Sequence, residues 1–265
     1  MNNKIPLNYY GGKYRISKKL IELFPPHTTY CEPFCGGASV FWCKPRSEVE
    51  ILNDHDERLI ALYRCMQEKS EEFLRRIEYT PYSEAEHRKA SQILKNYKQY
   101  SQVDIAWAVF INMNQGFSGV IGGGWSRSKG TTKPPVRYLN KKKALQQFFK
   151  RLEKVYISCC DAIKCLDYWD SEDTLFYLDP PYPGAEQGHY SGYTVEDFNR
   201  LCERLDTIEG SFLLSCYERS AFKIPDSWEK YQIKTIKSAG PDKCKSIETV
   251  YRKVSKKVKR QVFFM

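Results

Sequence analysis

Hydrophobic residues follow two patterns along the chain. Short apolar runs, typical of buried strands, occur at seven places, namely 29–34, 49–52, 155–160, 174–178, 211–215, 231–236 and 249–254. Apolar residues at helical spacing lie at 13–24 and 195–205. Strands that alternate with helices in this way predict an α/β fold built on a sheet.

The middle of the chain has a different pattern. Two long stretches, 57–78 and 83–115, have the apolar spacing of amphipathic helices, and 116–135 is rich in Gly, Ser, Thr and Lys and ends in two prolines. Gly and Pro disfavour a helix interior, and a loop of this length in a compact domain is usually functional or disordered. We therefore predict a domain formed by residues 1–55 and 151–265, with residues 56–150 inserted as a second, helical domain.

The net charge of +10 is unevenly distributed. Ten Lys or Arg residues and one acid, Glu153, lie between Arg127 and Lys154, and six bases without an acid lie between Arg252 and Arg260. Like charges at this density repel one another unless a polyanion binds them. A nucleic acid is therefore favoured as partner over the alternative, a solvated basic face.

The ten cysteines predict neither a metal site nor disulfides. No pair has the C-x-x-C spacing of a zinc site, and several lie in apolar runs, where cysteine behaves as a small buried hydrophobe. The N-terminus lacks the apolar stretch of a signal peptide, and no apolar run has the length of a membrane span. We expect no metal, no membrane contact and a reducing cytoplasm as the location.

Glycine turns and a carboxylate follow the first two predicted strands. Residues 32–39, Glu-Pro-Phe-Cys-Gly-Gly-Ala-Ser, allow a nucleoside-type ligand close to the backbone, although a plain strand-to-helix turn fits at least equally well. Asn53-Asp54 ends the next strand, and beside the glycine turn a ribose-binding carboxylate is preferred over a helix N-cap. Tyr9-Tyr10-Gly11-Gly12-Lys13 places an aromatic ring and a cation around two glycines, which is equally typical of a turn with a solvated lysine.

The apolar strand 174–178 runs directly into Asp179-Pro180-Pro181-Tyr182. Two prolines remove two backbone donors and end the strand, which leaves the Asp179 carboxylate and nearby carbonyls as acceptors beside the Tyr182 ring. An exocyclic amino group on a planar base needs such acceptors, because hydrogen bonds from both of its N–H groups free the nitrogen lone pair for attack. The ring can stack on a base that has left the duplex. A rigid Pro-Pro turn without a function is the less favoured interpretation.

In these motifs and in their order, the chain resembles the Dam-like DNA adenine-N6 methyltransferases (class alpha, D12-type) over nearly its whole length. The resemblance implies a Rossmann-like methyltransferase fold that uses S-adenosyl-L-methionine and yields S-adenosyl-L-homocysteine. It also implies a helical target-recognition domain with a DNA-contacting β-hairpin at about 117–139. The implied activity is methyl transfer to the N6 amino group of adenine in DNA after base flipping.

The resemblance assigns roles to three groups of residues. Catalysis is implied for Asp179, Pro180, Pro181 and Tyr182. Cofactor binding is implied for Tyr9, Lys13, Glu32, Phe34, Gly36, Asp54, Asp161 and Asp179, with Asp54 at the ribose and Asp161 near the adenine. DNA binding is implied for Ser118, Arg127, Lys129, Lys133 and Arg137. Phosphate contact is the favoured role of Arg127 and Lys133.

The chain departs from the family at three places. Tyr9 stands where Trp is frequent, and Ala38 stands where the last glycine of the turn is usual; both changes should alter cofactor affinity more than chemistry. The hairpin segment Ile121-Gly122-Gly123-Gly124-Trp125-Ser126-Arg127 does not match that of members specific for GATC, so this recognition sequence is not inferred.

Other functions are less favoured. Cytosine-N4 methyltransferases more often have Ser at the position of Asp179, glutamine methyltransferases usually have Asn there, and RNA is the less favoured nucleic acid. A binding protein without catalysis would keep the basic loop and lose the tetrad, and a dinucleotide-dependent oxidoreductase needs G-x-G-x-x-G, which the chain lacks.

We expect a monomer or weak dimer from a bacterium, phage or mobile element; whether a cognate restriction endonuclease is a partner stays open.

Overall fold

The computed structural model describes residues 5–117, 119–131, 133–183, 192–217, 220–236 and 245–263. The chain forms two compact units. The helical unit consists of residues 1–12, 36–43 and 54–159, and the sheet unit consists of residues 13–35, 44–53 and 160–265. This division by packing places 1–12, 36–43, 54–55 and 151–159 in the helical unit, whereas the predicted functional domains placed them in the catalytic part. The functional division stays a prediction.

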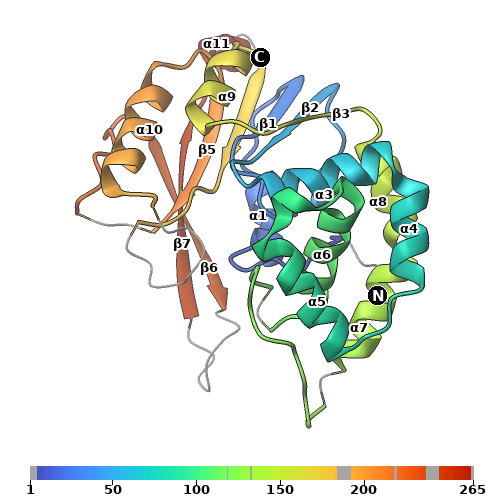
Figure 1. Cartoon of the computed structure of the whole chain (residues 1–265). Coiled ribbons are helices and arrows are strands. Elements are labelled where there is room, and N and C mark those ends of the chain that lie inside the picture. The colour runs from blue at the N-terminus through green and yellow to red at the C-terminus, as the bar shows by residue number, and fades with distance from the viewer. Residues whose placement is uncertain are drawn as a thin grey trace. The chain divides into compact units, whose positions relative to one another are not determined.

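The fold contains a sheet of parallel and antiparallel strands (Figure 1). Its seven strands have the order β3-β2-β1-β4-β5-β7-β6. The bounds are β1 Thr29–Glu32, β2 Val49–Asn53, β3 Val155–Ser158, β4 Thr174–Leu178, β5 Ser211–Cys216, β6 Glu229–Ile236 and β7 Lys245–Lys253. Strands β2, β1, β4 and β5 are parallel, whereas β7 is antiparallel to both β5 and β6. The predicted α/β class is confirmed. Because parallel strands end at one edge, Phe34 after β1 and Asp179 after β4 start from the same edge of the sheet.

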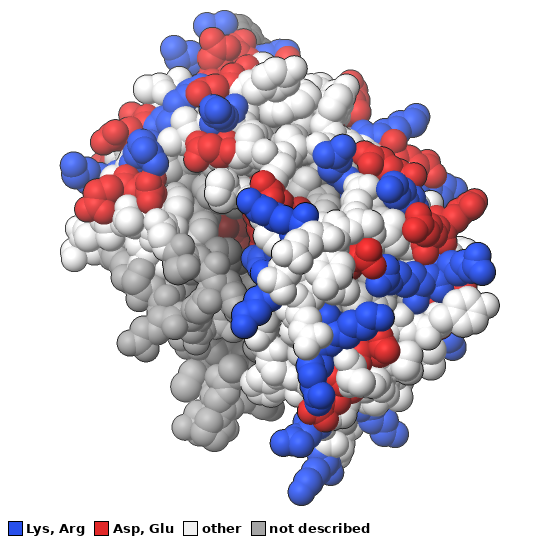
Figure 2. All heavy atoms as spheres, viewed as in Figure 1, with Lys and Arg blue, Asp and Glu red and all other residues white. Residues whose placement is uncertain are grey.

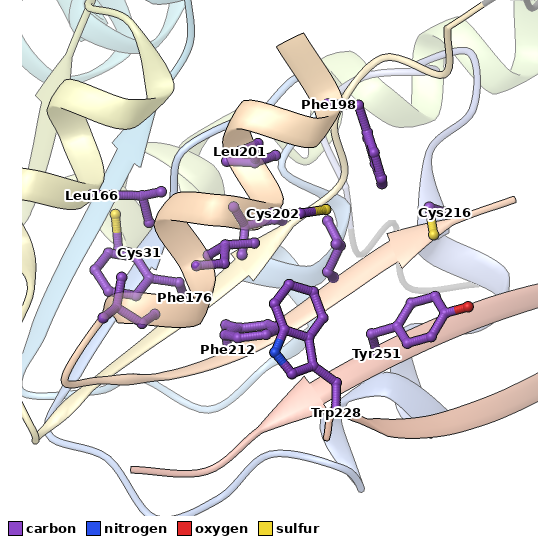
Figure 3. Packing of buried hydrophobic residues seen from close by; sticks show 14 of the residues in the cluster. Cys31, Leu166, Phe176, Phe198, Leu201, Cys202, Phe212, Cys216, Trp228 and Tyr251 are labelled. Atoms are coloured by element: carbon purple, nitrogen blue, oxygen red, sulfur yellow. The ribbon is translucent and has the colours of Figure 1, made fainter. Parts of the chain in front are cut away.

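The core of the sheet unit explains why its strands are apolar without alternation. All five residues of β4 and all six of β5 are buried, as expected for strands covered on both faces. Figure 3 shows Leu201 and Cys202 of a helix packed over Phe176 and Phe212 of these strands, with Trp228 beside Phe212. The helices of this unit are η1 Lys13–Arg15, α1 Ser17–Ile21, α9 Ala162–Trp169, α10 Val195–Thr207 and α11 Lys256–Phe263.

The helical unit is built around one fully buried helix, α6. Nearly all of its residues are buried, and a capping box between Ser101 and Asp104 defines where it begins. The helices of this unit are α2 Ser39–Cys43, α3 Glu57–Glu68, α4 Ser70–Glu78, α5 Glu84–Lys95, η2 Tyr97–Gln99, α6 Gln102–Gln115, α7 Pro134–Lys143 and α8 Leu145–Leu152. Because α6 ends at Gln115, it fixes the start of the glycine-rich basic loop that follows.

Several predicted boundaries were wrong for local reasons. The helical stretch 57–78 is interrupted at Lys69, whose φ of −133° is not helical, and the stretch 83–115 is interrupted at 96–101 before the Ser101 cap. The predicted hairpin region 117–139 is helical from Pro134 onward, because proline lacks the N–H that a first helical turn leaves unused. Among the described residues of its other part, Trp125 forms an antiparallel bridge to Gly116, just before the region.

Two further observations concern the chain as a whole. No helix within the described ranges has the length and apolar character needed to cross a membrane. The nine cysteines that the structure describes are all free thiols, and most of them are buried.

Candidate active site

Asp179 lies where a buried strand reaches the surface of the sheet unit. Strand β4 ends at Leu178, and the Asp179 side chain is 22% exposed. Pro180 is buried and Pro181 is half-buried, so the two prolines form a rigid exit from the strand. The sequence-predicted tetrad is therefore at the carboxyl edge of the sheet, where open α/β proteins bind their ligands.

Four polar side chains from distant parts of the chain meet at this point. Lys13 donates hydrogen bonds from Nζ to Asp179 Oδ1 at 2.8 Å and to the Tyr182 hydroxyl at 3.0 Å. The Tyr182 oxygen lies 2.9 Å from Asp179 Oδ1 and 2.9 Å from Glu248 Oε1. Lys13 Nζ is also 3.5 Å from Glu248 Oε1. We call Lys13, Asp179, Tyr182 and Glu248 the carboxylate cluster.

Burial and charge shift the protonation of this cluster. Burial by itself would lower the pKa of Lys13, but the Asp179 and Glu248 carboxylates outweigh it and raise that pKa above its ordinary value. Lys13 is therefore an ammonium ion. Burial raises the pKa of Glu248, against the opposing effect of Lys13. Burial, together with the neighbouring carboxylates, also raises the pKa of Tyr182 well above its ordinary value, so the phenol keeps its proton.

Sequence reasoning missed Glu248. The predicted strand began at Thr249, because a charged residue at the start of an apolar run resembles a strand terminus. In the structure Glu248 lies inside β7, opposite Ile233 of β6, and its side chain is 5% exposed. The available signal was strand periodicity, since Glu248 is two residues from the buried Val250 and thus on the same face.

The other predicted residues of the sheet unit have identifiable neighbours. Glu32 is buried at the end of β1 and accepts a hydrogen bond from the Tyr30 hydroxyl at 2.7 Å. The half-buried Phe34 ring contacts the Tyr193 ring edge-on, with centroids 6.0 Å apart. Asp161 is exposed and caps α9 by accepting from the Ile163 N–H. Within the described ranges, no group of three or more His, Cys, Asp or Glu side chains could hold a metal ion.

In the helical unit, Asp54 holds the glycine turn. Its Oδ2 accepts the Gly36 N–H at 2.8 Å, and its Oδ1 accepts the Asp56 N–H at 2.9 Å. The N-cap of α3 is Asp56, so Asp54 is not a helix N-cap, which was the less favoured interpretation from the sequence. Burial raises the pKa of Asp54, against these backbone hydrogen bonds. The Tyr63 hydroxyl donates to the Gly36 carbonyl at 2.6 Å and closes the turn from the other side.

Tyr9 explains the paired glycines of this turn. A Cβ atom on Gly37 would lie 2.4 Å from Tyr9 Cβ, and one on Gly36 would lie 2.9 Å from Tyr9 Cε1. Gly36 has a φ of +46°, which suits glycine. Ala38 follows with a φ of +50°, so alanine here occupies a left-handed conformation that glycine adopts more easily.

The segment 116–137, which comprises the loop after α6 and the first turn of α7 and which we call the basic loop, presents four of its five predicted DNA-binding residues to solvent. Arg127, Lys129, Lys133 and Arg137 are exposed, whereas Ser118 lies outside the described residues. In Figure 2, Lys and Arg side chains predominate at the lower end of the helical unit, where the loop before α7 is seen in Figure 1. An exposed aromatic, Phe117, begins the loop with 71% of its surface accessible.

One base from the same run is not part of this surface. Lys141 is 6% exposed and donates a hydrogen bond to the Ile5 carbonyl, and burial lowers its pKa to about 8. Lys142 is half-buried and donates to the carbonyls of Glu78 and Thr80. Lys141 belongs to the basic run that the sequence associates with a nucleic acid, but its burial removes it from any DNA-contacting surface, because composition shows charge but not exposure.

Comparison with known proteins identifies the family. A family model described as D12 class N6 adenine-specific DNA methyltransferase matches residues 9–239. A DNA adenine methylase of Haemophilus influenzae is 24% identical over 214 residues, which cover 75% of this chain and 71% of that protein. The Type II methyltransferase M.MjaIII of Methanocaldococcus jannaschii is 26% identical over 219 residues, which cover 73% of this chain and 74% of that protein.

Two further matches are more limited. The modification methylase StsI of Streptococcus sanguinis is 37% identical over 65 residues, which are 24% of this chain and 10% of that protein. The rRNA methyltransferase aviRa of Streptomyces viridochromogenes superposes with a TM-score of 0.43 and 12% identity over 96% of this chain and 89% of that chain. Because the family model extends from Tyr9 through the glycine turn and the Asp179 tetrad, the chain belongs to the D12 class N6 adenine-specific DNA methyltransferase family.

Proposed function

We propose that the Asp179 carboxylate and the Pro180 carbonyl accept the two hydrogen bonds of the adenine N6 amino group during methyl transfer to DNA. One observation supports this most directly. Asp179 Oδ1 is engaged by Lys13 and Tyr182, whereas Oδ2 accepts no hydrogen bond from the described part of the chain. A carboxylate fixed through one oxygen presents the other in a defined direction, which is the preorganisation that a weak nucleophile requires.

Lys13 has a supporting role in this proposal. An ionised carboxylate that leaves water is costly unless a cation pairs with it. The Lys13 ammonium group, itself 9% exposed, lies 2.8 Å from Asp179 Oδ1 and offsets that cost. We propose that Lys13 keeps Asp179 anionic and correctly oriented, rather than acting as a base itself.

S-adenosyl-L-methionine is the proposed methyl donor. It supplies an electrophilic methyl group on a sulfonium centre. In the helical unit, the Gly36-Gly37 turn lacks side chains, and the Asp54 carboxylate retains an acceptor position for a ribose hydroxyl beside its backbone hydrogen bonds. In the sheet unit, the half-buried Phe34 ring offers an apolar face for the adenine.

The target adenine is proposed to leave the duplex and to stack on Tyr182. The hydrogen bonds of the Tyr182 hydroxyl fix the plane of its ring, and the Tyr217 ring packs against it with centroids 4.6 Å apart. A ring held at its hydroxyl edge and by a neighbouring ring is suited to stack on a planar base.

The product of the reaction tests the proposed chemistry. Incubation of the protein with DNA and methyl-labelled S-adenosyl-L-methionine should place the label in N6-methyladenine, measured after digestion to nucleosides. Mapping the modified positions then gives the recognition sequence. Label in N4-methylcytosine, or in RNA in preference to DNA, contradicts the proposal.

The exposed bases of the basic loop are proposed to contact DNA phosphates. Replacing Arg127, Lys129, Lys133 and Arg137 together by alanine should weaken DNA binding and flatten its salt dependence. Each lost phosphate contact reduces the slope of log K against log salt by about 0.9. The measurement is a fluorescence-anisotropy titration of a DNA duplex at several salt concentrations.

Lys141→Met provides the matched control for this experiment. It removes a positive charge from the same run, but the charge is buried and bonded to the Ile5 carbonyl. The control should leave the salt slope unchanged. A slope that falls equally in Lys141→Met, or that stays constant in the fourfold variant, contradicts the assignment of this loop as the DNA contact.

Restriction–modification is the proposed biological setting. The names of two relatives, a modification methylase and a Type II methyltransferase, support it. The free thiols of the described cysteines are in keeping with a reducing cytoplasm, which we propose as the location.

A further inference from the structure

The Tyr182 hydroxyl bridges two carboxyl groups. Its oxygen is 2.9 Å from Asp179 Oδ1 and 2.9 Å from Glu248 Oε1. It also accepts a hydrogen bond from Lys13 Nζ at 3.0 Å. A phenol has one proton to donate and two lone pairs that accept. The three oxygens of Asp179, Tyr182 and Glu248 therefore form a continuous chain of hydrogen-bond distances.

The hydrogen-bonded row of these three oxygens lacks one proton when both carboxyl groups are ionised. The single Tyr182 proton can serve only one of the two 2.9 Å contacts, and the other then joins two oxygens without a hydrogen between them. Lys13 cannot supply it, because the paired carboxylates keep its ammonium group protonated. One additional proton, on either carboxyl group, would satisfy both contacts at once.

Methyl transfer to an amino group releases one proton. As the nitrogen forms its bond to the methyl carbon, the carbon–sulfur bond breaks and its electron pair goes to sulfur. The nitrogen then carries the methyl group, both original protons and a positive charge, and it becomes neutral when one proton leaves. Asp179, which the proposed function places against that amino group, is the first acceptor within reach.

We propose that Glu248 is the final acceptor of this proton, which reaches it through the Tyr182 hydroxyl. Asp179 takes the proton from the amino nitrogen on Oδ2. A half-turn of its carboxyl group then exchanges the two oxygens and brings this proton to the Tyr182 oxygen, while Tyr182 passes its own proton to Glu248. Tyr182 ends neutral, Asp179 ends ionised and Glu248 ends protonated, so charge and protons balance. The inference rests on the proposed role of Asp179.

The surroundings of Glu248 suit a group that holds a proton temporarily. Its side chain is 5% exposed, which favours the neutral carboxyl group, and burial raises its pKa. Among the described residues, the charged and titratable groups that face it are Lys13 from η1, Asp179 and Tyr182 from the segment after β4, and Tyr177 from β4. The opposing effect of Lys13 lets Glu248 give the proton up again once the product has left.

Glu248→Gln tests the proposal, because the amide keeps the shape of the side chain and cannot take up a proton. At pH 8, the single-turnover rate should fall by about a hundredfold or more, an effect typical of the loss of general acid–base assistance. In the wild type the rate should also fall as the pH is lowered and Glu248 becomes protonated in advance. This acidic limb should disappear in Glu248→Gln. Glu203→Gln, an exposed change on α10, is the matched control and should leave the rate and its pH profile unchanged.

Tyr182→Phe distinguishes proton transfer from simple support of the site. It keeps the ring and removes the bridge. If the proton passes through the hydroxyl, Tyr182→Phe and Glu248→Gln should cause equal losses and the double variant should be no slower than either. Additive losses, an acidic limb that persists in Tyr182→Phe, or an unchanged rate in Glu248→Gln overturns the proposal. If Glu248→Gln does not fold, the rate and the acidic limb of Tyr182→Phe alone test the proton route.

Two readouts separate failure of this inference from failure of the proposed function. The dissociation constants for S-adenosyl-L-methionine and for DNA should be unchanged in Glu248→Gln, since neither ligand contacts Glu248 in the proposal. If Asp179→Ala abolishes transfer while Glu248→Gln has no effect, only the proton route is wrong. If Asp179→Ala retains transfer, the proposed function is wrong as well.

Discussion

Asp179→Ala should reduce the single-turnover rate of methyl transfer to adenine by about a thousandfold or more. The variant loses the acceptor proposed to prepare the amino nitrogen, and removal of one preorganised group that stabilises a transition state typically costs 10²–10³ in rate. It also loses the first acceptor for the released proton, so the total loss should lie at or beyond the upper end of that range. The measurement is incorporation of labelled methyl groups with enzyme in excess over DNA.

The structure predicts that this variant folds. Lys13 loses its partner at 2.8 Å but retains the Glu248 carboxylate at 3.5 Å, so no unpaired buried cation remains. Asp173→Ala is the matched control, since it removes an aspartate of the sheet unit that pairs with Lys257 at the surface. The control should transfer methyl groups at the wild-type rate. Turnover of Asp179→Ala within tenfold of wild type would falsify the proposed mechanism.

The strands and the tetrad were predictable because their signals are local. A strand buried on both faces has to be apolar throughout, and β4 is observed with the predicted bounds, Thr174–Leu178. Asp179-Pro180-Pro181-Tyr182 could be interpreted because prolines end a strand wherever they occur. The glycine turn was also visible, but the reason for two glycines is the Tyr9 side chain, which is distant in sequence and which no local pattern reveals.

The remainder depends on contacts between distant parts of the chain. Lys13 and Glu248 are separated by more than two hundred residues, and only folding brings their charges within 3.5 Å. Lys141 and Arg137 occur in one basic run on one helix, yet the first is buried and the second exposed. Lys141 lies with Tyr138 among the buried residues of α7 and donates to the Ile5 carbonyl. Charge can be counted from a sequence, whereas the partner of each charge cannot.

Gly37→Ala should raise the dissociation constant for S-adenosyl-L-methionine by about tenfold or more. The added Cβ would lie 2.4 Å from Tyr9 Cβ and 2.9 Å from Tyr9 Cγ. A rotamer change cannot move Tyr9 Cβ, because that atom is fixed by the backbone, so either the turn or residues 8–10 must shift. The turn resists such a shift, since the Gly36 N–H is bonded to Asp54 and the Gly37 carbonyl accepts from Trp42. Overpacking of this kind typically costs 1–3 kcal/mol.

Two controls make this experiment specific to the turn. Gly124→Ala changes a glycine of the same unit whose added Cβ would meet no atom within 4 Å. This variant should bind the cofactor with wild-type affinity, measured by calorimetry in the absence of DNA. Adding Tyr9→Gly to Gly37→Ala removes the atom responsible for the clash and should therefore recover part of the lost affinity, although it also deletes the ring. An affinity that Gly37→Ala leaves intact, or that falls equally in Gly124→Ala, contradicts the assignment of this turn to the cofactor. Recovery in the double variant would identify the close approach of Tyr9 as the reason this turn needs glycine.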